Sequence, residues 1–306
     1  MNKTTVVVAG ATGMLGHMVL DVLARESGLR VVATARGLGS TGAAVRPGGE
    51  WRELDAETAT IADISRAVEG AAHVVNCIGL IKQRIDEDDP VQVERAILVN
   101  ALFPRRLGRA ARACAAQVLQ IATDCVYSGA KGRYVEPDVH DALDVYGKTK
   151  SLGECRLEPM RNLRCSIVGP ELNGKVSLLG WFLAQPKGAK LNGFANHKWN
   201  GVTTLHFAKL CAGIVKTGLK LGALQHVVPA DVVTKHELLR LLARAYGRDD
   251  LSITPVEAKT AVDRTLATDN AGLNAAIWKA AGYGAPPTVS RMVEELAAYE
   301  SSVMGR

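Results

Sequence analysis

The chain has 306 residues, a formal net charge of +6 and a sequence pI near 9.0, and its 47% hydrophobic and 22% charged residues are ordinary for a globular protein. Its basic residues are scattered, no apolar run approaches the roughly 20 residues of a membrane span, no signal-peptide layout is present, and the six cysteines form no CxxC pair. We therefore expect a cytoplasmic protein with no nucleic-acid partner, no membrane partner and no metal site.

The first predicted strand and the turn after it are the most informative part of the chain. The three valines at 6–8 predict a strand that is buried on both faces of a parallel sheet. Gly10, Gly13 and Gly16 follow, and a helix is predicted to begin near Met14. Glycines in such a turn let the backbone approach a phosphate, and the helix N-terminus attracts the anion. The pattern predicts a dinucleotide site, with a glycine-rich turn that binds nothing as the alternative.

The second predicted strand, residues 29–35, indicates which dinucleotide is bound. It ends at Arg36, where an NAD-dependent enzyme usually carries an acidic residue for the ribose. A guanidinium at this position can pair with a 2′-phosphate. We predict that NADP(H) is preferred and NAD(H) is the second choice; a solvated surface arginine is the alternative.

Strands and helices alternate through the first half of the chain. The pattern predicts helices near 60–69, 89–115 and 145–158, and strands near 73–78, 117–122 and 163–168. This alternation predicts an α/β fold, a doubly wound parallel sheet of the NAD(P)-binding Rossmann type.

The pattern changes after Pro170, and shorter helices are predicted near 203–217, 234–246, 273–281 and 288–300. We expect a dinucleotide-binding domain over 1–170, to which segments near 201–228 return. Residues 171–306 are then mainly a smaller C-terminal substrate-binding lobe.

Tyr146 and Lys150 are spaced to share one face of a helix. An ammonium beside a phenol favours the phenolate, so we expect Lys150 to lower the pKa of Tyr146 and let it exchange a proton with a substrate oxygen. Thr123 follows the predicted strand 117–122 and can hydrogen-bond the same oxygen. The three residues predict reduction of a carbonyl by hydride from a nicotinamide, with an exposed helix face as the alternative. Lys150 could also hold the nicotinamide ribose.

Four stretches of the sequence carry a resemblance to a known family. They are GATGMLG at 10–16, ATDCVYSG at 122–129, YVEPD at 134–138 and YGKTKSLGE at 146–154. Together they resemble the extended short-chain dehydrogenase/reductases, and among these the dTDP-4-dehydrorhamnose reductase family and its sugar-nucleotide-binding relatives.

The resemblance implies that Thr123, Tyr146 and Lys150 are catalytic and that Tyr146 and Lys150 also contact the cofactor. It further implies cofactor contacts along the chain: Gly10, Thr12, Gly13, Met14, Leu15 and Gly16 at the pyrophosphate, Asp55 near the adenine, Cys77, Ile78 and Gly79 at the ribose, Asn100 as a brace of the active-site helix, and Ser166, Ile167 and Val168 beside the nicotinamide. Glu136 and Asp138 match loop acids that support a metal at a dimer contact in some relatives; capping or turn acids are the favoured interpretation here. A homodimer is a family expectation.

Substrate contacts are expected from strand ends and from residues 171–204. The candidates are Lys82, Asp124, Cys125, Glu171, Asn173, Asn192, His197, Trp199 and Asn200.

The chain departs from the family pattern at Cys125, at Lys148, at 142–145 and at 76–83, so a nucleotide-linked sugar outside the rhamnose pathway is expected. The leading hypothesis is an NADP(H)-dependent reductase of a nucleotide-linked 4-keto-6-deoxy-sugar. An epimerase of the same fold is the first alternative, and a non-catalytic cofactor-sensing protein is the second. A dehydratase is disfavoured because no Glu follows Asp124.

Overall fold

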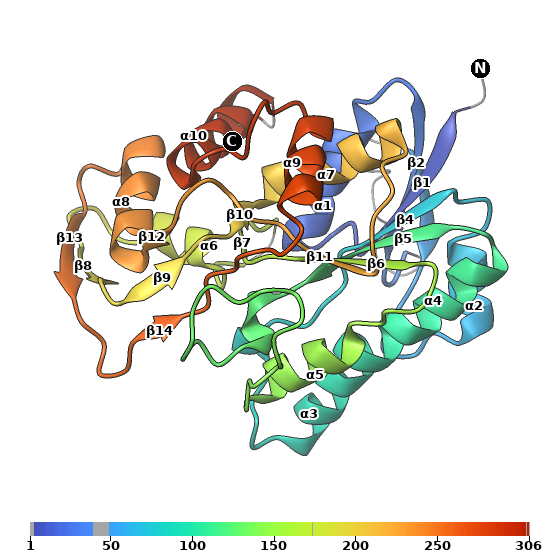
Figure 1. Cartoon of the computed structure of the whole chain (residues 1–306), viewed down its shortest axis with the longest axis horizontal. Coiled ribbons are helices and arrows are strands. Elements are labelled where there is room, and N and C mark those ends of the chain that lie inside the picture. Colours follow the sequence, from blue (N-terminus) through green and yellow to red (C-terminus); the bar gives the residue numbers. More distant parts are fainter. Residues whose placement is uncertain (1–2, 39–48, 173, 304, 306) are drawn as a thin grey trace.

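A seven-stranded parallel sheet lies at the centre of the protein (Figure 1). The computed structural model describes residues 3–38, 49–172, 174–303 and 305. The strands of the sheet, in spatial order, are β11 (Leu224–His226), β6 (Met160–Arg164), β5 (Gln117–Ala122), β4 (His73–Asn76), β1 (Thr4–Ala9), β2 (Leu29–Ala35) and β3 (Glu50–Glu53). The order in which the chain adds strands to the sheet reverses between β1 and β4, and a doubly wound fold binds its ligand at this switch point. The predicted fold class is confirmed.

Helices cover both faces of this sheet, as the valines of β1 predict. Val6 and Val8 join an apolar core with α1 (Met14–Ala24) and α7 (Thr204–Thr217), and Val7 joins a second core with α2 (Ile61–Ala67) and α4 (Phe103–Ala113). Figure 1 shows α1 and α7 on one side of the sheet and α2 and α4 on the other. All three valines are fully buried, so β1 lies in the middle layer of a three-layer structure.

The single helix predicted over 89–115 is interrupted. It consists of α3 (Pro90–Ala96), a π-helical stretch η2 (Ile97–Leu102) and then α4. The wider π turn contains Asn100, whose amide is used by the chain that leaves β4: its Oδ1 accepts from Leu80 N at 2.8 Å and its Nδ2 donates to Leu80 O at 2.9 Å. Such bulges are frequent at functional sites.

Two predicted boundaries differ in the structure. Helix α5 (Val145–Gly153) ends five residues before the predicted 158. The strand predicted over 163–168 is two strands, because β6 ends at Arg164 and β7 (Ile167–Val168) leaves the main sheet to pair with β10 (Val202–Thr203). Both changes follow from long-range pairing, which local periodicity does not record.

Most of the C-terminal half lies beside the main sheet. It contains α6 (Leu178–Leu183), α8 (Lys235–Ala245), α9 (Ala271–Ala280) and α10 (Val289–Val303), a β8–β13 pair (Lys190–Phe194 with Ser252–Val256), and β9 (His197–Trp199) between β12 (Val233–Thr234) and β14 (Val262–Asp263). Segment 201–228 lies against the first half, since α7 packs on α1 and β11 pairs with β6. The division into two domains stays a prediction. No helix in the described part of the chain has the length and apolarity to cross a bilayer.

The contact between α5 and η2 leads to a stability prediction. A Cβ at Gly153 would lie 1.9 Å from the carbonyl oxygen of Asn100, so the two helices could not keep their present separation. We expect Gly153→Ala to lower the free energy of unfolding by about 1–3 kcal/mol in denaturant titrations. Gly28→Ala is the control, because no described atom lies within 4 Å of its Cβ position. Equal stability of the two variants would contradict the packing described.

Candidate functional site

The three predicted catalytic residues come from two elements that meet at the carboxyl end of β5. Thr123 is the N-cap of the short helix η3 (Asp124–Val126), and its hydroxyl accepts from Cys125 N at 3.1 Å. The Thr123 side chain lies near the Tyr146 phenol and acts against the rise in the pKa of that phenol. Lys150 Nζ donates to the Ile121 carbonyl at 3.3 Å, which anchors α5 to β5 beside Thr123.

The expected effect of Lys150 on Tyr146 is wrong in this structure. The pKa of Tyr146 is raised, chiefly by burial, with the neighbouring Cys125 and Asp124 adding to the shift. The ammonium of Lys150 bonds to a backbone carbonyl instead, and burial lowers the pKa of Lys150 itself. Tyr146 is therefore held in the protonated form, which is the form that a proton donor requires.

The glycine turn fits a dinucleotide pyrophosphate. Gly10 has φ +79°, and a Cβ at Gly16 would lie 2.0 Å from the Gly10 carbonyl oxygen, so both positions need glycine. Gly13 is the N-cap of α1, and no side chain among the described residues caps that helix or places an acid in its first turn. Thr12 and Gly13 are exposed, whereas Leu15 is buried. The free N–H groups of α1 thus face a turn that is open to an anion.

The end of β2 presents a cation at the next edge of the crevice. The Arg36 side chain is 59% exposed, and its Nη1 lies 3.1 Å from Glu57 Oε1. Glu57 also accepts from Arg95 Nε at 2.7 Å, and its own N–H donates to Asp55 Oδ1 at 2.9 Å. Arg36 and Asp55 are therefore linked through Glu57, at the position where the family resemblance predicts the adenosine end of the cofactor.

The exit of β4 connects this crevice to the catalytic helix. Cys77 N donates to the carbonyl of Ala9 on β1, and Ile78 lies against Gly10. A Cβ at Gly79 would lie 3.6 Å from Asn100 Oδ1 and 3.8 Å from Lys150 Nζ.

Asn100 links the same exit to α5 through a bond from its Nδ2 to Thr149 Oγ1 at 3.3 Å. On the other side of the crevice, Ser166 Oγ accepts from Trp199 Nε1 at 2.9 Å, and the β7 residues Ile167 and Val168 pair with β10.

Several predicted substrate residues have structural partners instead. Both ends of the Asn200 amide bond to the backbone of Leu266, at 2.7 and 2.9 Å. Glu171 accepts from two backbone N–H groups ahead of α6, and His197 bonds to the Thr260 carbonyl.

The remaining substrate predictions divide by location. Asn192 lies on β8, which Figure 1 shows at the end of the molecule away from the main sheet. Lys82, in the 3₁₀ turn η1 (Lys82–Arg84), pairs with Asp144, the N-cap of α5, at 2.8 Å. Asn173 lies outside the described residues.

Two cations from the C-terminal half, which sequence reasoning missed, act on the predicted catalytic centre. Lys235 Nζ lies 5.7 Å from the centre of the Trp199 ring, and Arg264 Nε donates to the Tyr127 carbonyl at 2.8 Å. Burial raises the pKa of Asp124, and the charges of Arg264 and Lys235 oppose that rise. The sequence positions of Lys235 and Arg264 do not indicate a functional site, because the β12–β9–β14 sheet brings them to the predicted catalytic residues only in the folded chain.

Comparison with known proteins identifies the family. A family model described as the RmlD substrate binding domain matches residues 4–169, more than half of the chain. The chain belongs to the RmlD substrate-binding-domain family. The matched region contains the glycine turn and all three predicted catalytic residues, whereas Lys235 and Arg264 lie beyond it.

Individual relatives of this RmlD-family chain match part of its sequence and nearly all of its fold. A dTDP-4-dehydrorhamnose reductase of Streptomyces griseus is 38% identical over 150 residues, which are 48% of this chain and 42% of that protein. The chain thus spans less than half the length of that relative. The dTDP-4-dehydrorhamnose reductase of Bacillus anthracis in complex with NADP has a TM-score of 0.70 at 16% identity, over 96% of this chain and 98% of that one. The UDP-glucuronic acid 4-epimerase of Bacillus cereus in complex with NAD has a TM-score of 0.71 at 15% identity, over 99% and 98%.

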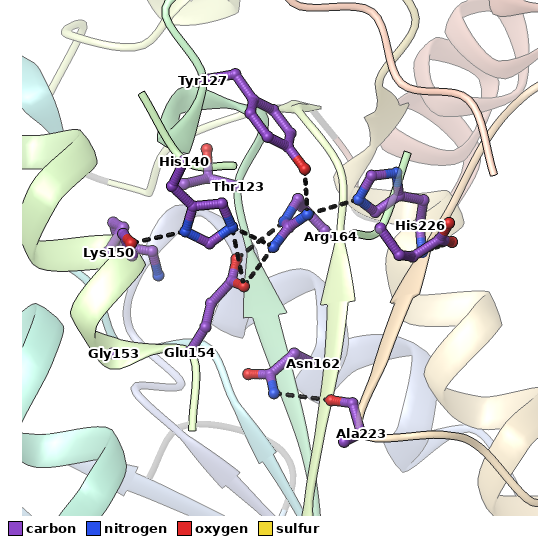
Figure 2. A network of polar contacts seen from close by, with 12 residues as sticks. Thr123, Tyr127, His140, Lys150, Gly153, Glu154, Asn162, Arg164, Ala223 and His226 are labelled. Atoms are coloured by element: carbon purple, nitrogen blue, oxygen red, sulfur yellow. Dashed lines mark hydrogen bonds and ion pairs between the residues drawn. The ribbon is translucent and has the colours of Figure 1, made fainter. Parts of the chain in front are cut away.

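A buried polar network lies beside the catalytic helix of the RmlD-family region (Figure 2). At its centre is Arg164, the last residue of β6, which has no exposed surface. Its Nε and Nη2 donate to the two oxygens of Glu154 at 3.0 and 2.5 Å, and its Nη1 donates to the Tyr127 hydroxyl at 2.6 Å. The charge of each partner is therefore compensated inside the protein.

Two histidines complete the network as neutral acceptors. Arg164 donates to His226 Nε2 at 2.6 Å and to His140 Nε2 at 2.7 Å, and a guanidinium has no lone pair to accept with. The Nδ1–H groups then donate to the Ala267 carbonyl and to Ser151 Oγ, at 2.7 and 2.6 Å. Burial is the main cause that lowers the pKa of both histidines.

The loop acids Glu136 and Asp138 are both used within the chain. Glu136 accepts from His226 N, from Thr268 Oγ1 and from Asp269 N at 2.6–3.0 Å. Asp138 accepts from Val135 N and pairs with the ammonium of Lys131. No cluster of three or more His, Cys, Asp or Glu within the described ranges is placed to hold a metal.

The neutral histidines predict loss of stability in acid. Below about pH 6.5 the unfolded chain binds protons at positions 140 and 226 that the folded chain excludes, so the free energy of unfolding falls as the pH falls. Denaturant titrations from about pH 8 to about pH 5 should show a weaker fall for the double variant His140→Gln/His226→Gln, because glutamine accepts a hydrogen bond without titrating. The other histidines are the same in the wild type and the double variant. An identical pH dependence of the free energy of unfolding in the two proteins would therefore contradict the assignment of His140 and His226 as neutral.

Proposed function

We propose that this chain is an NADP(H)-dependent reductase of a nucleotide-linked 4-keto-6-deoxy-sugar. The observation that carries the proposal is the placement of Thr123 beside Tyr146 and Lys150, at the carboxyl edge of a sheet whose first turn fits a pyrophosphate. The similarity to the reductase of Streptomyces griseus supports the substrate class.

In the proposed mechanism the chain binds the cofactor, orients the substrate carbonyl and protonates the carbonyl oxygen. The N-terminus of α1 and the turn at Gly10 hold the pyrophosphate, and the bound reduced nicotinamide supplies hydride to the carbonyl carbon. Thr123 orients the carbonyl oxygen by a hydrogen bond, and Tyr146 gives its phenolic proton to the same oxygen. The raised pKa of Tyr146 keeps that proton in place until negative charge develops on the oxygen, which is more basic than a phenolate.

The C-terminal half supplies charge for the anionic part of the substrate. The two positive charges of Lys235 and Arg264 exceed the single negative charge that the buried Asp124 carboxylate can carry, and both of them act to lower its pKa. A nucleotide-linked sugar carries a diphosphate, and two partly buried cations suit such a group. The apolar face of Trp199 beside Lys235 offers a surface for a sugar or a base.

Arg36 supports the choice of NADP(H). Its exposed guanidinium at the end of β2 forms a surface ion pair with Glu57, which a 2′-phosphate can replace at little cost. The Bacillus anthracis reductase, of the same fold, is a complex with NADP, and the Bacillus cereus epimerase is a complex with NAD.

The epimerase alternative uses the same residues and cofactor fold. Its distinguishing property is that the cofactor is regenerated in each cycle, so added NADPH is not consumed. The non-catalytic alternative does not require Thr123, Tyr146 and Lys150 to lie together. Homodimer formation and a cytoplasmic location stay predictions.

Removing the phenolic hydroxyl tests the proposal. With NADPH and a panel of nucleotide-linked keto-sugars, we expect Tyr146→Phe to lower kcat by about 100-fold or more while the cofactor still binds, because only the proton donor is lost. Absorbance loss of NADPH and product structure are the measurements. Tyr299→Phe is the control, because it removes a hydroxyl on α10 that bonds to Asp21 on α1. Sugar conversion without NADPH consumption would establish the epimerase instead, and full activity of Tyr146→Phe would exclude the mechanism.

The cofactor assignment is tested at β2. Arg36→Ala should raise KM for NADPH by roughly 10-fold and leave KM for NADH unchanged, since only NADPH carries the 2′-phosphate. Arg25→Ala removes an equally exposed arginine from an ion pair with Asp21 on α1 and serves as the control. A wild type that prefers NADH, with no effect of Arg36→Ala, would refute the assignment.

A further inference from the structure

The predicted catalytic residues lie on two short elements whose ends are held by one side chain. Helix η3 begins at Thr123, its N-cap, and ends at Tyr127, its C-cap. Helix α5 carries Tyr146 and Lys150 and ends at its C-cap, Glu154. Arg164 contacts the C-cap of each, Tyr127 through the hydroxyl and Glu154 through both carboxylate oxygens (Figure 2).

This contact is rigid because every donor of the guanidinium is used. The Nε–H bonds to Glu154, the two Nη1 hydrogens bond to Tyr127 and His226, and the two Nη2 hydrogens bond to Glu154 and His140. Arg164 and Glu154 have side-chain exposures of 0% and 3%. Five acceptors around one planar group leave it no second orientation.

The other two acceptors link Arg164 to further segments of the chain. His140 is also bonded to Ser151 of α5, and His226 to the carbonyl of Ala267 in the C-terminal half. The orientation of Arg164 therefore depends on both halves of the protein, and the two catalytic elements depend on Arg164.

We propose that Arg164 is a positioning residue, which sets Thr123 on η3 beside Tyr146 on α5. The inference rests on the proposed function for its catalytic consequence, whereas the structural link between η3 and α5 can be measured without it. Lysine at this position carries the same charge but only three donors from a single atom, so it cannot hold both C-caps in one plane.

Besides its contact with Arg164, the charge of Glu154 acts on the predicted catalytic residue Lys150. Glu154 lies one helical turn after Lys150, and its carboxylate opposes the fall in the pKa of Lys150 that burial causes. Cys125 on η3 acts in the same direction.

The first test measures the link itself by amide hydrogen exchange. Arg164→Lys should speed exchange in 124–127 and in the last turn of α5, at 150–154, and leave α4 unchanged. The control Arg161→Lys makes the same substitution on the same strand, at a side chain that pairs with the exposed Glu158, so it should change neither segment.

Tyr127→Phe removes the arm to η3, together with the bond that the hydroxyl donates to the Val135 carbonyl at 3.1 Å, and leaves the Glu154 pair in place, so it tests the inference even where Arg164→Lys does not fold. It should speed exchange in 124–127 alone. Unchanged exchange there in Tyr127→Phe, or in both segments of a folded Arg164→Lys, would overturn the inference whether or not the chain reduces a keto-sugar.

The second test is a double-mutant cycle with Thr123→Ala in the NADPH assay. Arg164→Lys should lower kcat by roughly 10- to 100-fold with KM for NADPH within about twofold, the loss expected when a reacting group moves by about 1 Å. In the Thr123→Ala background the further loss should be below about threefold, because there is no hydroxyl left to position. Equal losses in both backgrounds would overturn the inference. A wild type that does not oxidise NADPH would refute the proposed function alone and leave the exchange result to decide this one.

Discussion

The parallel sheet imposes the constraint on which the rest of the structure depends. All seven strands of the main sheet run in one direction, so the polar ends of β1, β4, β5 and β6 arrive at the same edge. Groups buried there cannot keep their water and must satisfy one another. Asn100 does this for the exit of β4, Lys150 for β5 and Arg164 for β6. The same bonds that remove the cost of burial place the predicted catalytic side chains together.

What the sequence could predict was local, and what it could not was set by contacts between distant segments. The valines of β1 and the glycine turn follow from adjacent residues, and the fold and family are confirmed. The π-helical stretch at Asn100 packs against Gly153 at the end of α5, a contact between residues that are distant in the sequence. Lys235 and Arg264 reach the site through β12 and β14, two-residue strands too short to leave a periodic pattern.

The acidity of Tyr146 shows how burial can reverse an argument made from one charged pair. A spacing of four residues indicates that Lys150 is near, but not which way its ammonium points. It points to the carbonyl of Ile121, and the phenol faces the anionic and apolar groups around Cys125.

The two halves of the protein differ in what they contribute to the predicted site. The region matched by the family model ends at 169 and holds the glycine turn and the predicted catalytic residues Thr123, Tyr146 and Lys150. Lys235 and Arg264 lie outside that region, and their charges act on Asp124, next to Thr123. Because His226 and Ala267 also hold Arg164 in place, the C-terminal half is part of the frame around the predicted catalytic elements as well as a source of charge beside them.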